Sequence, residues 1–215
     1  MNYLQRFTVQ GTQSLIPALL FLAACASTPK ISQADIASIT NGENGALLLS
    51  LETNGISCRT AEISLKNTDT DQTVQANIIK PGGKAPAFQI LALSAGSYQI
   101  GGITCISHSE DSQFFYKETS TIRGTADAYE AFNISDGVAT YPGTVSLSRE
   151  RGVRSTARFD ILDKATIIQA AASEQAPSLA ARFNYMPITV DNTLTGHINY
   201  NRQHSLKPKP AQPKP

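Results

Sequence analysis

The sequence predicts a mainly β protein, an antiparallel β-sandwich with a short helical segment near its C-terminal end. Apolar and polar residues alternate over most of the chain after residue 45, which is the period of a half-buried strand. Nearly every interval between these runs holds Gly, Pro, Asn or Asp, as turns require. About eight or nine short strands at such spacing favour a sandwich.

The expected strands follow one another closely. The first two, 47–51 and 59–65, each place three apolar side chains on one face. A pair of glycines, Gly101 and Gly102, interrupts the strand expected at 97–106. The other expected strands of this series are 74–78, 88–93, 113–119, 129–134, 138–147 and 153–161, and a last strand is expected at 194–201, after the helical segment.

Residues 163–182 depart from the alternation because they are rich in alanine, a strong helix former. Asp163 is a suitable N-cap, and Pro177 suits the first turn of a second short helix. We expect this helical segment to cover a sheet edge or one end of the sandwich.

Length and composition favour one folded domain outside the chain ends. The chain has 215 residues, of which 41% are hydrophobic and only 16% are charged, so it is not a disordered chain. Its 18 Lys and Arg residues nearly balance 17 Asp and Glu residues. No basic field is therefore available to hold nucleic acid, and we expect no nucleic-acid partner.

The first 24 residues have the layout of a secretory signal peptide. A polar start containing Arg6 precedes the apolar residues 15–24, which end at Cys25. Ten apolar residues span about 15 Å as a helix, whereas the hydrocarbon core of a bilayer is about 30 Å thick. We therefore expect cleavage of this segment and no transmembrane anchor.

The four residues Leu22-Ala23-Ala24-Cys25 resemble the lipobox of bacterial lipoproteins. The resemblance implies that Cys25 becomes the first residue of the mature chain and carries a diacylglyceryl thioether and an N-acyl chain such as palmitate. Ala26 and Ser27 lack the Asp that retains such lipoproteins at the inner membrane, which implies the outer membrane of a Gram-negative bacterium, facing the periplasm. Ordinary signal-peptidase cleavage after Ala26 is the alternative.

Two stretches of the body carry a further resemblance. Residues 91–100 (LALSAGSYQI) are similar to a strand entry of transthyretin-like and carboxypeptidase-regulatory-like sandwiches. Residues 132–143 (FNISDGVATYPG) are similar to a hairpin in Gram-negative lipoproteins of unknown function. Both imply a transthyretin-like or immunoglobulin-like sandwich, although turn chemistry with positive φ at Gly96 and Gly137 also explains them.

The chain thus divides into a signal peptide (1–24), a lipidated Cys with a flexible tether (25–45), a β-sandwich domain (46–202) and a tail (203–215). Small polar residues and two Asn-Gly pairs characterise the tether. The tail is rich in Pro and Lys, so we expect it to be disordered or to form extended polyproline II.

Acylation of Cys25 leaves Cys58 and Cys105 as an even pair in a compartment that favours disulfides. A bridge between them closes a loop of about 48 residues and stabilises the fold by roughly 4 kcal/mol. Two separately buried thiols are the alternative, whereas a redox pair lacks its C-x-x-C motif.

The sequence contains no recognisable catalytic motif. Three histidines are present, and there is no G-x-S-x-G; an S-x-x-K match at 27–30 lacks its K-T-G companion. His108, Glu110 and Asp111 share a polar stretch, but they are too few and too irregularly spaced to indicate zinc. We expect no enzyme activity, metal or cofactor.

Four arginines form the densest basic cluster: Arg149, Arg151, Arg154 and Arg158. A solvated strand face with local ion pairs explains them, and an anion or partner contact is the functional alternative. We expect a non-catalytic binding or structural module of the cell envelope, anchored in membrane lipid through Cys25, with an envelope protein or peptidoglycan as partner. An enzyme acting on envelope polymers and a small-ligand carrier remain the alternative functions.

Overall fold

The computed structural model describes residues 30–79, 87–110, 114–152 and 155–206, and every structural statement below refers to these ranges. The signal peptide, the lipobox, Cys25 and residues 207–215 lie outside them. The described chain is mainly β, as expected. Its elements are α1 (Gln33–Thr40), β1 (Gly45–Asn54), β2 (Thr60–Asn67), β3 (Thr73–Ile79), β4 (Phe88–Leu93), β5 (Gly96–Glu110), β6 (Phe114–Arg123), α2 (Thr125–Ala128), β7 (Phe132–Ile134), β8 (Ala139–Tyr141), β9 (Thr144–Arg149), β10 (Thr156–Leu162), α3 (Ala165–Gln175), α4 (Pro177–Ala180), β11 (Phe183–Tyr185) and β12 (Thr195–Leu206).

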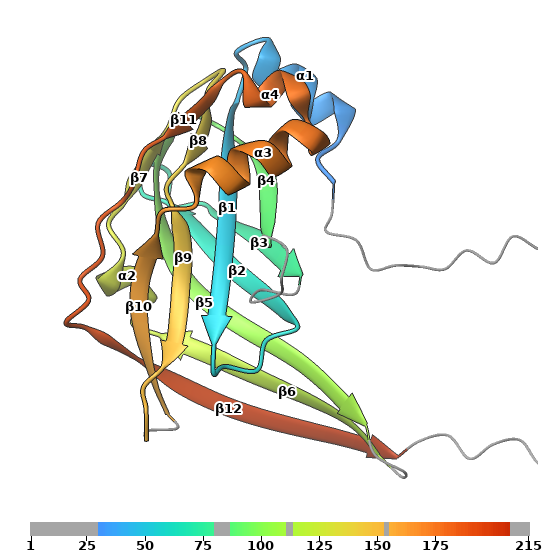
Figure 1. The fold of residues 1–215 in the computed structure, drawn as a ribbon, viewed down its shortest axis with the longest axis vertical. Helices are drawn as coiled ribbons and strands as arrows, with labels where there is room; N and C mark the ends of the chain where they lie inside the picture. The colour runs from blue at the N-terminus through green and yellow to red at the C-terminus, as the bar shows by residue number, and fades with distance from the viewer. Residues whose placement is uncertain (1–29, 80–86, 111–113, 153–154, 207–215) are drawn as a thin grey trace, which may run out of the picture.

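The strands of the described ranges join in one large mixed sheet (Figure 1). Its order is β11-β8-β1-β9-β10-β12-β6-β5-β2-β3, with β4 paired to β1 and β7 paired to β5. The expected antiparallel β-sandwich is not confirmed, because the described strands form one mixed sheet in which β1 pairs in parallel with β8 and β9, and β8 pairs in parallel with β11. Alternation reports which face of a strand is buried, but it carries no information about the direction of the neighbouring strand.

Strand β1 is buried on both faces and separates two hydrophobic clusters. Leu47, Leu49 and Leu51 face the larger cluster, which the curled sheet encloses. Leu48 faces the opposite way, toward a smaller cluster that includes Ile168 of α3. Figure 1 shows α1, α3 and α4 gathered at this end of the molecule, where they cover the outer face of the sheet. Burial of both faces explains the nearly continuous apolar run of β1.

The expected helical segment is confirmed as α3 and α4, but Lys164 and not Asp163 occupies the N-cap position of α3, and no side chain caps this helix. Asp163 accepts a hydrogen bond from the backbone N–H of Ala165 through Oδ1 at 3.0 Å. Pro177 occupies the first turn of α4, where its missing N–H costs nothing. The buried face of α3 is short and consists of Ile168 and Ala172.

Several strand boundaries differ from expectation. The strand expected at 138–147 divides into β8 and β9 at Pro142 and Gly143, and Gly143 has a φ of 102°. Of the expected strand 129–134, only residues 132–134 form a strand, and all three pair with β5. Helix α2 ends at Ala128, directly before the expected start of this strand. Strand β11 follows α4 directly and was not expected; its three residues are too few to show a period.

Two segments expected to lack structure are partly ordered. Residues 33–40 of the expected tether form helix α1, whose N-cap Ser32 accepts from the N–H of Asp35 at 3.1 Å. Ile39 packs this helix into the smaller cluster and is fully buried. At the other end β12 includes residues 203–206 of the expected tail, because its ladder with β6 continues to Leu206. The rest of the tail lies outside the described residues.

The predicted disulfide between Cys58 and Cys105 is confirmed, with a Cα–Cα distance of 4.8 Å. Cys105 lies in β5 opposite Ala61 of β2, and Cys58 precedes β2. The bridge therefore ties the segment between β1 and β2 to the centre of the neighbouring strand.

Strands β5, β6 and β12 continue past the core as a three-stranded ribbon, visible at the lower right of Figure 1. We call residues 106–110, 114–119 and 201–206 the arm. The ladder between β12 and β6 keeps one register from the core, where His197 lies opposite Arg123, to the tip of the arm, where Leu206 lies opposite Phe114. The ladder between β5 and β6 also shows no register shift. Leu206 is 73% exposed and Phe115 is 44% exposed, so the arm displays apolar surface away from the core.

Candidate functional site at the base of the arm

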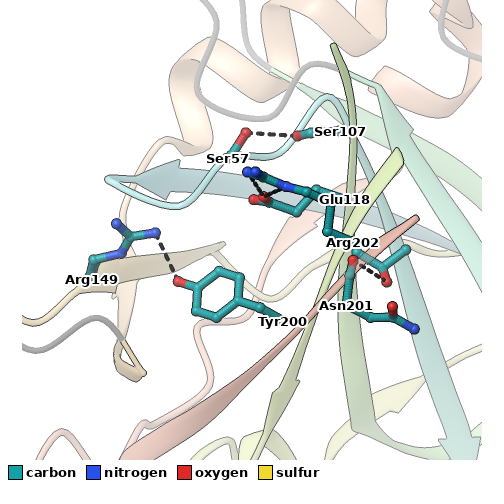
Figure 2. Close-up of polar contacts among 8 residues, drawn as sticks. Ser57, Ser107, Glu118, Arg149, Tyr200, Asn201 and Arg202 are labelled. Carbon is teal, nitrogen blue, oxygen red and sulfur yellow. Dashed lines mark hydrogen bonds and ion pairs between the residues drawn. The ribbon is translucent and has the colours of Figure 1, made fainter. Parts of the chain in front are cut away.

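A hollow of about 600 Å³ opens where the core ends and the arm begins. Four side chains line it: Glu118 of β6, Arg149 of β9, and Tyr200 and Arg202 of β12. Side chains of a strand alternate between faces, so Tyr200 and Arg202 share a face with Ile198, which is buried in the larger cluster. The hollow is thus a polar continuation of the core face, and Figure 2 shows its side chains.

Glu118 and Arg202 form an ion pair across the ladder. They lie directly opposite one another in the register of β6 and β12. The Nη2 atom of Arg202 lies 2.7 Å from Oε2 of Glu118, and the Nε atom of Arg202 lies 3.3 Å from the same oxygen. The pair fixes both side chains on this face of the arm (Figure 2).

Arg149 reaches the same hollow from β9. Its Nη2 atom donates to the Tyr200 hydroxyl at 2.8 Å, and its guanidinium carbon lies 5.8 Å from the centre of the Tyr200 ring. The Nε atom of Arg149 is buried and has no hydrogen-bond partner among the described residues. No described carboxylate forms an ion pair with Arg149. The hollow therefore carries two guanidinium groups against one carboxylate.

A second hollow of about 330 Å³ lies farther out on the arm. Its lining mixes aromatic and polar side chains, among them Phe115, Tyr116 and His204. The ring of His204 meets that of Phe114 edge to face, with centroids 5.7 Å apart. The arm therefore offers polar and aromatic contact groups along much of its length, as binding surfaces do.

The structure separates the three described arginines of the predicted basic cluster. Arg158 pairs with Glu150 at 2.7 Å on an exposed face, so the interpretation as a local ion pair is confirmed for this residue. Arg151 is exposed in the turn after β9, and Arg154 lies outside the described residues. Only Arg149 of the three described arginines lines the hollow.

Sequence reasoning missed Glu118, Tyr200 and Arg202. Glu118 and Arg202 are 84 residues apart, and only the register of β6 against β12 brings them together. Glu118 and Tyr200 lie in the expected strands 113–119 and 194–201, whereas Arg202 lies beyond the expected end of the last strand. The sequence does not show which residues of two strands face each other.

The large pKa shifts of the described chain belong to buried tyrosines outside the hollow. Burial raises the pKa of Tyr141 to about 12, and it also raises the pKa of Tyr129. Both rings belong to the hydrophobic clusters. Desolvation disfavours the phenolate and accounts for these shifts, so they indicate tight packing of the rings.

Within the described ranges, no three His, Cys, Asp or Glu residues gather closely enough to hold a metal ion. His108 is exposed on β5, and Asp111 lies outside the described residues. No helix of the described ranges combines the length and apolar character needed to cross a membrane.

Comparisons with known proteins add little. No protein-family model matches the chain, and no curated protein matches it. Among solved structures, a leucine-rich repeat protein from Bacteroides thetaiotaomicron is similar over 49% of this chain and 14% of its own length, with 19% identity and a TM-score of 0.34. The chain thus spans a small part of that protein, and a likeness at this level carries no argument about fold or function.

Proposed function

We propose that this protein is a lipid-anchored, non-catalytic binding module of the Gram-negative cell envelope, and that it contacts its partner through the arm. The lipobox at residues 22–25 supports the anchor. The observation that supports binding is the hollow at the base of the arm, where Arg149 lacks a carboxylate partner among the described residues. A guanidinium group held in such a position is suited to recognise an anionic group of another molecule.

The fold supports a defined orientation on the membrane. Cys25 precedes the first described residue, Lys30, by five positions, so an anchor at Cys25 lies within about 18 Å of Lys30. Helix α1 begins three residues later, and Figure 1 shows it at the end of the molecule opposite the tip of the arm. An outer-membrane anchor would thus hold the helical end near the bilayer and direct the arm into the periplasm.

Metabolic labelling tests the anchor. Cells that express the chain are grown with an alkyne-bearing palmitate, and the labelled protein is detected after coupling to a fluorophore. We expect label on the wild-type chain in the outer-membrane fraction and none on Cys25→Ser. Equal labelling of both chains, or an unlabelled wild type cleaved after Ala26, contradicts the anchor.

Site-specific photocrosslinking tests the binding surface. A photoreactive phenylalanine analogue replaces Leu206 on the arm, and as a matched control it replaces Gln169, which is exposed on α3. We expect a discrete crosslinked species in intact cells from position 206 and not from position 169. Crosslinks from position 169 and not from position 206 would contradict binding through the arm and would indicate that the partner contacts the helices.

A further inference from the structure

We propose that the outer edge of β12, over residues 202–206, is a strand-addition site for an extended acidic polypeptide. This inference rests on the proposed binding function and names the chemistry of its partner. In strand addition, an extended segment pairs its backbone with an exposed sheet edge, and its alternate side chains supply specificity.

The backbone direction along β12 follows from its neighbours. Ile198 donates its N–H to the carbonyl oxygen of Ser155 at 2.7 Å, on the side away from β6. Alternate residues of a strand point their backbone groups to the same side, and the ladder with β6 shows no register shift. The N–H and C=O groups of Arg202, His204 and Leu206 therefore point away from β6. No strand among the described residues pairs with them there.

Among the described residues, the edge over 202–206 carries one charged side chain, Arg202, and no strand covers it; Lys207 and Pro208 follow it directly in the sequence. Natural edge strands are blunted by lysine, proline, bulges or a covering element. Residues 201–206 read NRQHSL and contain neither lysine nor proline. The arm also carries Leu206, which is 73% exposed, so an added strand would gain apolar contact as well as backbone hydrogen bonds.

The charged side chains beside this edge indicate which kind of polypeptide would pair with it. Arg202 and Leu206 lie on the face of the arm that continues into the hollow, and Arg149 lies beside Tyr200 at its base. A strand paired with β12 would place alternate side chains on this same face. Because the hollow holds two guanidinium groups and one carboxylate, acidic side chains at those positions are favoured and basic ones are repelled.

Two synthetic peptides provide the first test. Each has ten residues; one alternates Val with Glu and the other alternates Val with Lys, and both carry a fluorophore. Fluorescence anisotropy is measured with the full chain in mild detergent. We expect saturable binding of the Glu peptide, weakened by salt, and at least about tenfold weaker binding of the Lys peptide. Equal affinities would overturn the proposal.

A proline substitution tests the edge itself. His204→Pro removes an N–H that points away from β6, so the ladder with β6 is kept while an added strand loses a hydrogen bond and meets the proline ring. We expect about tenfold weaker binding of the Glu peptide. His204→Thr keeps the N–H and serves as the matched control. Arg149→Gln should weaken the Glu peptide and reduce the difference in affinity between the two peptides, because one guanidinium and one carboxylate then remain in the hollow.

The remaining outcomes are also decisive. If circular dichroism shows that His204→Pro unfolds, Leu206→Pro replaces it, because its outward N–H lies at the end of the strand. Unchanged binding to a folded proline variant overturns the proposal. A dimer of the chain that both proline variants abolish, without binding of the Glu peptide, assigns the edge to a second copy and overturns it too. Labelling at Cys25 and crosslinking from position 206 do not depend on this pairing, so the proposed function can stand if the strand-addition site fails.

Discussion

At the residue scale, two buried tyrosines show how the clusters accommodate polar atoms. The Tyr129 hydroxyl donates to the carbonyl oxygens of Ser146 and Asp160, at 3.2 and 3.3 Å. The Tyr141 hydroxyl lies 2.6 Å from Thr144 Oγ1. Thr144 donates in turn to Ser50 at 3.1 Å. Satisfied hydroxyl groups of this kind avoid the cost of burying an unpaired donor.

The raised pKa of Tyr141 predicts a loss of stability in alkali. An unfolded tyrosine ionises near pH 10, whereas folded Tyr141 stays protonated up to about pH 12. Between these values the unfolded state binds fewer protons, so rising pH favours unfolding. We expect the free energy of unfolding to fall by up to about 1.4 kcal/mol per pH unit for this group. Urea titrations at pH 8, 10 and 11 measure it.

Tyr141→Phe is the control for this prediction. It removes the ionisable hydroxyl and the contact with Thr144, so the variant should be less stable at pH 8 by about 1 kcal/mol. Its stability should then decline less steeply between pH 10 and 11 than that of the wild type. If the free energy of unfolding falls equally steeply with pH in both proteins, the loss of stability in alkali comes from other groups, such as Tyr129.

The residue scale also shows why only part of the candidate site was predictable. Arg149 stands out in the sequence because it belongs to a dense basic cluster. Its partner Tyr200 is 51 residues away, and the contact exists because β9, β10 and β12 are consecutive in the sheet. A pattern read along one strand cannot identify a neighbour on another.

At the element scale, the local signals were reliable where they rest on short-range chemistry. Pro177 begins α4 as expected, because its missing N–H is a local effect. Asp163 lies one residue before the N-cap of α3, which is Lys164, and it accepts from the N–H of Ala165. Helix α1 was missed although Ser32 and Asp35 form its cap. The helix is short, and the burial of Ile39 stabilises it, which the sequence does not reveal.

The disulfide predicts a large effect of reduction on stability. It ties the segment before β2 to β5 across 47 positions of sequence. On the chain-entropy model, opening this loop costs roughly 4 kcal/mol of unfolding free energy. Urea unfolding of the oxidised and the reduced protein measures the difference. The double variant Cys58→Ala and Cys105→Ala should not respond to the reductant. A difference below about 1 kcal/mol would be inconsistent with a bridge that constrains the unfolded chain.

At the scale of the whole molecule, β1 links the two hydrophobic clusters. Leu49 packs within the curled sheet, and the adjacent Leu48 packs under the helices. Both side chains are almost completely buried, at 0% and 1% exposure. A strand that contributes to both clusters should make them fold and unfold together.

We therefore predict that Leu48→Ala and Leu49→Ala each destabilise the protein by about 2–5 kcal/mol. Each variant should retain a single unfolding transition, with the same midpoint in far-ultraviolet and near-ultraviolet circular dichroism. Ile167→Ala is the control, because Ile167 is 52% exposed on α3 and its truncation should change stability by less than about 1 kcal/mol. Two separate transitions in Leu48→Ala would show that the helices form an independent unit.

Local chemistry and the period of side chains were enough to predict several properties of this protein from its sequence. These are the mainly β class, the inward faces of β1 and β2, the helical segment and the even pair of cysteines that proved to be bonded. The parallel pairing of β1 with β8 and β9, the strand order and the meeting of Arg149, Tyr200, Glu118 and Arg202 emerged only from the tertiary structure. The physical reason is that alternation specifies which face of a strand is buried. The choice, direction and register of its neighbours depend on packing among residues far apart in the chain.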